Sequence, residues 1–466
     1  MPYENESASK ASYIDIIKNP DVQEFLSKCE YIQPPSGQEA EQACSPFKLV
    51  PDFSGNLPQN IISWDGSPYE SSPDLQSIPS TRYVFVKLSG ILINTQKMRS
   101  LRNREQNLVD PFEVARLMEN RGSLHFVFPS SNLKYKSCSS VAEGFRKALH
   151  DWLSHPRTAL NSRDSIESTL FFLASMRPDK MATNDPRFLK IHSCPACQED
   201  AILTIENKDE EQFCPKCGAA VHPTDCLRLH EAVTETHSNQ EAAQRFMMTI
   251  EHLIAIHYIK YFLEEFPQVL GNMAFFIDGP LALFGQPAWL HSSIMKFING
   301  MNDKLNKLGL LKPTIIGLQK SGQVVDFTNL IANYIPNDTI APVTDEYRYK
   351  YILQNRDQAS KTFGYETYYG QDFIYKTKSG KIFVFGVPYP FADKNPVEAF
   401  NESKSNAQNY PEISSVASLI SSLETELYKN AVIPIALAHK YTAISLFPGG
   451  KVLDILTKAY LDKSSD

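Results

Sequence analysis

Apolar and polar positions along the chain divide it into segments typical of strands and helices. Residues 82–94, RYVFVKLSGILIN, are rich in β-branched and aromatic residues, which favours a strand. The predicted strands are residues 82–94, 273–278, 311–322 and 381–389. The predicted helices are residues 110–122, residues 140–155 and a long helix beginning at 238, where Ser238 and Glu241 have capping-box spacing. Strands that alternate with helices predict an α/β or α+β core around a mixed sheet.

The same pattern suggests a division of the chain. Residues 1–55 contain the polar stretch QPPSGQEAEQA and are interpreted as an N-terminal extension. Residues 56–190 and 222–466 form the two parts of one core, separated by a cysteine-containing insertion at 191–221. The second part closes with an apolar segment, NAVIPIALAHKYTAISLF, which contains His439.

Composition narrows the classes of protein to consider. The 466 residues are 42% hydrophobic and 21% charged, as in ordinary soluble proteins. No apolar run approaches the ~20 residues of a membrane span, and MPYENESASK lacks the features of a signal peptide, so we expect a cytoplasmic protein. A net charge of −7 argues against a basic, free-standing DNA-binding surface. Contact with a polyanion would need a local patch, metal ions or a partner.

Four of the eight cysteines form two Cys-x-x-Cys knuckles. Cys194 and Cys197 are followed, after sixteen residues, by Cys214 and Cys217. Two knuckles at this spacing can supply the four sulfurs of a tetrahedral zinc site, so we expect a zinc ribbon. A closed four-sulfur site leaves no position for a substrate, which makes this zinc structural. A redox pair is the alternative, but it would not require the second knuckle.

Three acidic residues stand where an unpaired charge is costly. Asp278 ends the apolar strand that begins at Met273, and Asp65 precedes Gly66 in a strand-to-turn context before a polar loop. Glu251 lies on the apolar stripe of the long helix. A buried carboxylate needs a cation, a metal or a proton. The alternatives are an ordinary Asp-Gly turn, and a glutamate that is partly exposed at the edge of the stripe or paired with an arginine.

Together the three carboxylates have the chemistry of a site for one or two hard divalent cations. Magnesium and manganese prefer oxygen ligands, and two ions about 3.5–4 Å apart can activate water against a phosphodiester. Lys320 could neutralise phosphate charge and His439 could donate a proton. Taken alone, Lys320 is a solvated lysine at a strand end and His439 a half-buried histidine.

The order of these motifs resembles that of the NurA nucleases. The matching elements are Asp65-Gly66-Ser67, Glu251 on a helix directly before Asp278-Gly279-Pro280-Leu281, Gly317-x-x-Lys320-Ser321, and Ala438-His439. The resemblance covers roughly residues 60 to 455. Compact members of the family lack the zinc ribbon that here separates the first motif from the glutamate.

The resemblance implies an RNase H-like fold and manganese-dependent cleavage of DNA, with 5′-to-3′ exonuclease and single-strand endonuclease activity. It implies that Asp65, Glu251 and Asp278 bind manganese or magnesium and that Lys320 and His439 complete the site. It also implies a homodimer docked on a HerA-type hexameric ATPase, acting in DNA end processing or in defence against foreign DNA.

Several alternatives remain open from the sequence. Glu143 and Glu167 compete with Glu251 for the second carboxylate position, and the tyrosine used by the family site cannot be chosen. A catalytically inactive NurA-like adaptor and a zinc-ribbon interaction protein are the other functional readings. The three intact carboxylates argue against the adaptor, and the lack of a basic stripe argues against a ribbon acting on nucleic acid.

Overall fold

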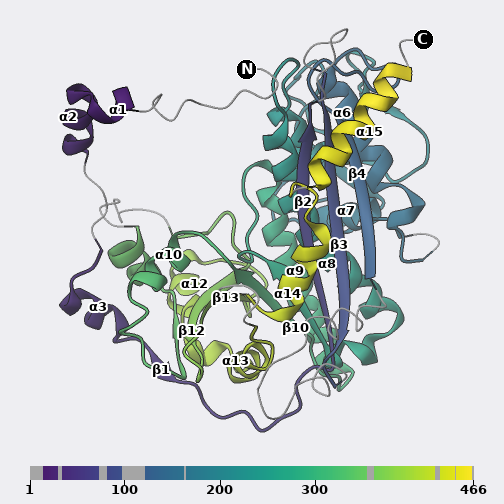
Figure 1. The fold of residues 1–466 in the computed structure, drawn as a ribbon. Helices are drawn as coiled ribbons and strands as arrows, with labels where there is room; N and C mark the ends of the chain where they lie inside the picture. Colours follow the sequence, from purple (N-terminus) through teal and green to yellow (C-terminus); the bar gives the residue numbers. More distant parts are fainter. Residues whose placement is uncertain are drawn as a thin grey trace.

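One large mixed sheet organises the protein (Figure 1). The computed structural model describes residues 14–29, 34–72, 81–96, 121–161, 164–353, 362–425, 431–446 and 448–463. Within these residues the sheet has nine strands, in the order β1 (Lys48–Leu49), β11 (Thr339–Pro342), β12 (Gly370–Lys376), β13 (Ile382–Pro388), β10 (Thr314–Gln319), β9 (Met273–Asp278), β2 (Asn60–Ser71), β3 (Tyr83–Asn94) and β4 (Arg121–Pro129). Strand β9 runs parallel to β2 and β10, and the other neighbours are antiparallel.

Helices cover both faces of the sheet. Along each strand, apolar side chains point alternately to one face and to the other. On one face, residues such as Ile62 and Trp64 pack against α6 (Val141–Leu153), α7 (Ile166–Ser175), α8 (Gln240–Glu265) and α9 (Leu290–Lys307). On the other face, residues such as Ile61 and Phe276 pack against α13 (Ile413–Ser422) and α14 (Ile433–Thr442). The period of two in each strand therefore produces a three-layer core.

The remaining helices lie around this core. Helices α3 (Gly37–Cys44) and α10 (Gln323–Leu330) pack on the sheet beside Ile374 and Val384. The others are α1 (Ile14–Lys18), α2 (Pro20–Lys28), α11 (Asp345–Tyr347), α12 (Val397–Lys404) and α15 (Gly449–Lys463). Helices α1 and α2 lie apart from the body, whereas α15 crosses near β2 (Figure 1). Within the described residues, no helix is both long and apolar enough to cross a bilayer.

The predicted mixed α/β core is confirmed, and most of its predicted elements are present. Strands β3, β9, β10 and β13 fall in the four segments with strand patterns, and α6 and α8 fall in two of the helical ones. The predicted helix at 110–122 lies almost wholly outside the described residues, and its last two residues open β4.

Two local predictions are wrong. The chain does not turn at Asp65, because β2 continues to Ser71 and pairs with β3 along its whole length. The capping box is also absent, since α8 begins at Gln240 and its N-cap is Asn239. The Asn239 side chain bonds to the backbone of residue 234 instead, so a contact within the preceding loop replaces the cap.

The cysteine insertion carries two small hairpins. One pairs β5 (Phe188–Ile191) with β6 (Leu203–Glu206), and the other pairs β7 (Gln212–Phe213) with β8 (Ala220–Val221). Buried residues of these strands, including Leu189 and Ile205, join the apolar core on the α6–α9 side. The insertion is therefore seated on the core.

Candidate functional site

Parallel pairing brings three of the predicted residues to one edge of the central strands. Asp278 is the last residue of β9, and Lys320 directly follows β10, its parallel neighbour. Asp65 lies on β2, the parallel neighbour on the other side of β9. Side chains two residues apart on a strand share a face. The side chains of all three residues therefore point to the face of the sheet that α13 and α14 cover, as the side chain of Phe276 in β9 does.

Lys320 links the two aspartates. Its Nζ lies 2.7 Å from Asp278 Oδ2 and 3.3 Å from Asp65 Oδ1. Because both oxygens contact one ammonium group, they lie within about 6 Å of each other. His439 approaches from α14, with Nδ1 3.3 Å from Asp65 Oδ2, and its side chain is 47% exposed. One buried carboxylate thus contacts two basic side chains that are distant in sequence.

Glu251 reaches the same region from the opposite layer. Its Oε1 accepts a hydrogen bond from the backbone N–H of Gly66, at 2.7 Å. A Cβ on Gly66 would lie 2.4 Å from Met247 Cγ and 3.0 Å from Glu251 Oε1. The Asp65-Gly66 pair therefore serves close packing of α8 on β2, since a larger residue would push the helix away.

Burial and mutual repulsion shift the pKa values of these acids. Burial raises the pKa of Asp278 to about 6, and the charge of Asp65 adds to the effect while Lys320 opposes it. Burial, then the charges of Asp278 and Asp65, raises the pKa of Glu251 well above its usual range. Burial also acts on Asp65, but the bond from His439 and the charge of Lys320 outweigh it and lower its pKa.

The two basic groups respond in the opposite sense. The bond to Asp65 raises the pKa of His439 against the effect of burial. Burial alone would lower the pKa of Lys320, but the charges of Asp278 and Asp65 raise it. The cluster is therefore a group of carboxyl groups whose negative charge is opposed by one ammonium group and a partly exposed imidazole.

The donor set suits a hard divalent cation, although Lys320 holds the position between the aspartates. Carboxylate oxygens are the ligands that magnesium and manganese prefer, and crowded acids with raised pKa values are relieved by a cation. Among the described residues, only the four cysteines bring at least three ligand atoms within 4.8 Å of one another. Metal binding at Asp65 and Asp278 would therefore require Lys320 to move aside.

The two competing glutamates are engaged elsewhere. Glu143 accepts bonds from the N–H and hydroxyl of Ser139 at the start of α6, at 2.7 and 2.6 Å. Glu167 lies 2.6 Å from His150 Nδ1. Of the three glutamates considered, Glu251 is the one that contacts the Asp65-Gly66 segment.

Thr442 belongs to the site but was not anticipated from the sequence. Its hydroxyl donates to the backbone carbonyl of Asp65 at 3.0 Å and to that of Ala438 at 2.7 Å. It follows His439 by three residues on α14, so the two side chains share a helix face. That spacing is a signal that could have identified Thr442.

A glycine-lined slot holds the segment that follows Asp278. A Cβ on Gly317 or Gly370 would lie 2.9 or 2.7 Å from atoms of Leu281, and one on Gly386 would lie 3.5 Å away. These glycines belong to three neighbouring strands, β10, β12 and β13, so Leu281 lies across the sheet. The carbonyl of Leu281 also accepts from Tyr369 N–H at 2.8 Å. The Asp-Gly-Pro-Leu segment thus crosses the sheet and is held there by the packing of Leu281. This packing restrains Asp278, the first residue of the segment.

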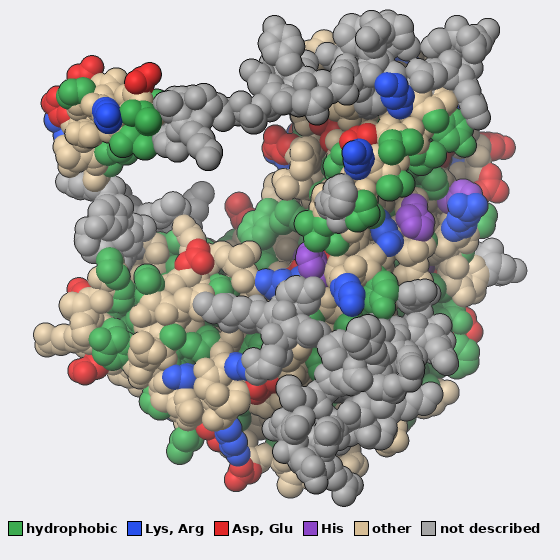
Figure 2. Space-filling view, in the orientation of Figure 1, with side chains coloured by type: hydrophobic (Ala, Val, Ile, Leu, Met, Phe, Trp, Pro, Cys, Tyr) green, Lys and Arg blue, Asp and Glu red, His purple; other side chains and the backbone are tan. Residues whose placement is uncertain are grey.

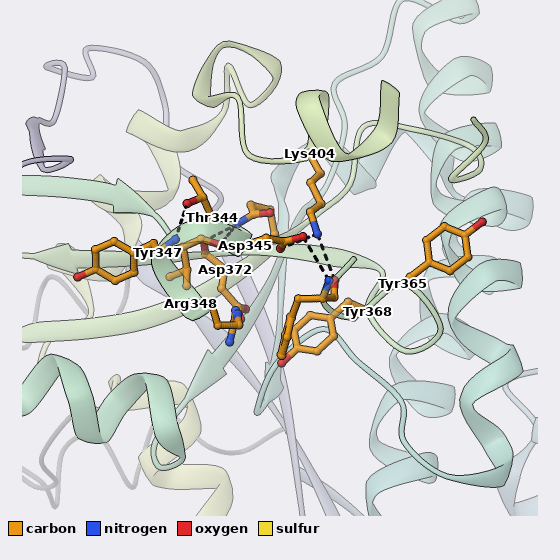
Figure 3. A network of polar contacts seen from close by, with 12 residues as sticks. Thr344, Asp345, Tyr347, Arg348, Tyr365, Tyr368, Asp372 and Lys404 are labelled. Carbon is orange, nitrogen blue, oxygen red and sulfur yellow. Dashed lines mark hydrogen bonds and ion pairs between the residues drawn. The ribbon is translucent and has the colours of Figure 1, made fainter. Parts of the chain in front are cut away.

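A buried polar network holds the residue before Lys320. Gln319 donates to Asp372 Oδ1 at 2.9 Å, and the guanidinium of Arg348 donates to Asp372 Oδ2 at 2.8 Å. Nearby, Lys404 pairs with Asp345 at 2.7 Å (Figure 3). Gly386 lies between β10 and β12 and its missing side chain leaves Asp372 Oδ1 accessible. The network ties β10 to β12 and so restrains the end of β10 from which Lys320 projects.

The four cysteines form a second cluster, on the insertion. Cys194 Sγ lies 3.7 Å from Cys217 Sγ, and Cys197 Sγ lies 4.0 Å from Cys214 Sγ. Sulfurs bound tetrahedrally to one zinc at ~2.3 Å would be separated by about 3.8 Å, so the cluster fits zinc. All four are free thiols, without a disulfide. Backbone N–H groups of Cys217 and Lys216 lower the pKa of Cys214 to about 7, whereas burial raises the pKa of Cys194 to about 11.

A cavity of about 510 Å³ lies beside the cysteine insertion. Its lining includes Arg177, Lys190, Cys194, Arg228 and His230, and none of the five acidic and basic residues of the predicted site. Arg177 is already paired with Asp179, and Arg228 with Glu231. The carboxylate cluster and this cavity are therefore separate features.

Comparison with known proteins finds neither a protein-family model nor a curated protein that matches this chain.

Proposed function

We propose that the protein is a metal-dependent DNA nuclease related to the NurA family. The observation that carries the proposal is the gathering of Asp65, Glu251, Asp278, Lys320 and His439 from five distant segments of the chain. Burying several carboxylates together costs stability. Such a cost is typical of functional sites, where pKa values are shifted by burial and like charge.

In this proposal, Asp65 and Asp278 hold manganese or magnesium, with Glu251 near them. A metal pair in such a site supplies an activated water and stabilises the leaving oxygen of a phosphodiester. Lys320, displaced from between the aspartates, would neutralise a phosphate oxygen. His439 is partly exposed and has a raised pKa, so it is suited to donate a proton to the leaving oxygen.

The sheet topology supports the RNase H-like core that the resemblance implies. Strands β4, β3 and β2 form an antiparallel meander, and β9 and β10 then continue from β2 in parallel. The proposed ligands Asp65 and Asp278 lie on β2 and at the end of β9, just beyond the point where the parallel pairing of these two strands stops. The remaining strands, β13, β12, β11 and β1, would be an extension of that core.

The decisive test is degradation of labelled single-stranded DNA by the purified protein, with manganese, with magnesium and with a chelator. The proposal expects cleavage that needs the metal and is lost in Asp278→Asn. A folded wild-type protein that leaves DNA intact with either metal would reject the nuclease and favour the adaptor.

We further propose, from the resemblance, that the protein acts as a homodimer with a HerA-type hexameric ATPase. The sequence contains no Gly-x4-Gly-Lys-Ser/Thr loop, and a net charge of −7 gives little non-specific grip on duplex DNA. Digestion of duplex ends would then need an external motor. Equal rates of duplex degradation with and without the ATPase and ATP would reject the motor partnership while leaving the nuclease proposal standing.

A further inference from the structure

A line of basic side chains crosses the sheet next to the carboxylate cluster. Asp65 on β2 pairs with Ser89 on β3, and Lys87 lies two residues along β3 on the same face. Lys87 in turn pairs directly with His125 on β4. Diagonal neighbours in a sheet are about 7–8 Å apart and direct partners about 5 Å. The line therefore starts beside Asp65 and ends at β4, the outer strand of the sheet.

Contacts of the Lys87 side chain show on which face of the sheet these basic residues lie. Lys87 Nζ donates to the carbonyl of Tyr441 on α14, so Lys87 points to the face on which His439 lies. His125 and Arg157 are exposed. Arg157 follows α6, whose Trp152 donates to the carbonyl of Val127 on β4, two residues from His125. Partial burial first, and then the positive charges of Lys87 and Arg157, lowers the pKa of His125. We call Lys87, His125 and Arg157 the cationic track; its charges near neutral pH are those of Lys87 and Arg157, because the lowered pKa leaves His125 neutral.

The track is a local concentration of positive charge on an acidic protein. Lysine, arginine and histidine side chains gather over β3, β4 and α14 on the face shown in Figure 2. The nearby carboxylate of Asp454, on α15, accepts bonds from Tyr69 and Ser71 at 2.8 and 2.7 Å. The whole chain carries −7, so this gathering of basic side chains is local.

Aromatic rings accompany the charges. Tyr83 and Phe85 precede Lys87 at two-residue intervals on β3, so they share its face, and both are half-buried. Their ring centroids are 6.5 Å apart. Proteins that bind single strands combine a positive groove for the phosphates with aromatic rings on which bases stack.

We propose that the cationic track holds the phosphates of a single-stranded DNA segment that continues from the scissile position at the Asp65–Asp278 cluster toward β4. This inference rests on the proposed nuclease function and adds the path of the strand. A single strand is favoured because the track is one line of charges flanked by aromatic side chains, which suits one backbone with accessible bases.

The test compares charge-removing variants on two faces of the protein. The track variant carries Lys87→Gln and Arg157→Gln. The matched control carries Lys304→Gln and Lys307→Gln, two exposed lysines on α9, which lies in the layer on the other face of the sheet. Arg157→Gln alone, a change at an exposed residue, covers the case in which the Lys87 change disturbs folding.

Binding of a fluorescein-labelled oligothymidylate is measured by anisotropy across a salt series, without divalent metal. The track variant should bind at least about tenfold more weakly, and its log–log salt slope should fall by about 1.4, or about 0.7 for each lost phosphate contact. Arg157→Gln alone should lose about half of that slope. Unchanged affinity and slope, or equal losses in the α9 control, would overturn the track.

Cleavage by the wild type separates this inference from the proposed function. If the wild type cleaves with manganese but the track variant binds normally, the track is wrong and the nuclease stands. If the wild type binds through the track but never cleaves, the track stands and the nuclease is wrong.

Discussion

The cysteine cluster and the carboxylate cluster are both groups of potential metal ligands, but they are assembled in opposite ways. The four sulfurs come from one stretch of 24 residues, Cys194 to Cys217, within the insertion, and lie close to one another. The acids come from β2, α8 and β9, and each already has a protein partner. A cluster built from one short stretch of chain depends on its metal for its local structure. A cluster built into the core keeps its shape without metal and can exchange ligands during a reaction.

The largest expected effect separates chemistry from folding at Asp278. Asp278→Asn removes a ligand oxygen and should reduce metal-dependent cleavage at least about 100-fold, because losing even supporting groups of a metal site costs 10–100-fold. The melting temperature should change little, because the substitution also removes repulsion with Asp65 and Glu251. Asp303→Asn, at an exposed acid on α9, is the control. Parallel losses of stability and activity would mean that Asp278 is structural.

The next effect concerns the metal of the insertion. Cys197→Ser, or zinc chelation, should abolish hydrogen-exchange protection near residues 190–220, because structural zinc supplies the folding energy of such knuckles. The carboxylate cluster should keep its protection, since it lies on other elements. Cys29→Ser, at an exposed cysteine that ends α2, is the control. Equal loosening across the whole core would show that the two clusters are coupled.

A smaller effect tests how α8 brings Glu251 to β2. Gly66→Ala should lower the free energy of unfolding by about 1–3 kcal/mol, because the new Cβ would meet Met247. Gly122→Ala on β4 has open space and should change it by less than about 0.5 kcal/mol. Met247→Ala added to Gly66→Ala should recover part of the loss. Denaturant unfolding of the four proteins measures this, and equal effects at both glycines would argue against close packing at Gly66.

The smallest effect is a pH dependence that arises from Asp278. The pKa of Asp278 is raised to about 6, so metal must displace a proton below that pH. Cleavage should therefore fall about tenfold for each pH unit below about 6, if a single proton controls binding.

Without metal, the same shift acts on stability in the other direction. The folded state holds the Asp278 proton up to about 6 and the unfolded state loses it near ~3.9, so stability should fall as pH rises between these values. Asp278→Asn should flatten the stability profile, measured as melting temperatures, while single-turnover rates of the wild type measure the cleavage profile. A profile that persists in this variant would assign the titration to another group.

The sequence indicated many of the elements that carry the site because the strands involved are long or strongly apolar. Strand β9 and its terminal Asp278, and β10 just before Lys320, were identified by that pattern alone. Asp65 was misplaced at a turn, because Gly66, Ser67 and Pro68 resemble loop residues locally. Pairing with β3 overrides that tendency, and Pro68 is tolerated because β9 pairs with β2 only as far as Trp64.

By itself, the sequence determined what depends on near neighbours: the alternation that makes the strands, the buried stripe that carries Glu251, and the two cysteine knuckles, whose sulfurs meet because little chain separates them. The tertiary structure alone decided which distant groups meet. The Lys320 ammonium lies between Asp65 and Asp278, His439 contacts Asp65 across 374 positions, and Gly66 is a packing residue for α8. The physical reason is that strand order, register and layer packing bring these groups together, and periodicity within one segment carries no information about its neighbours.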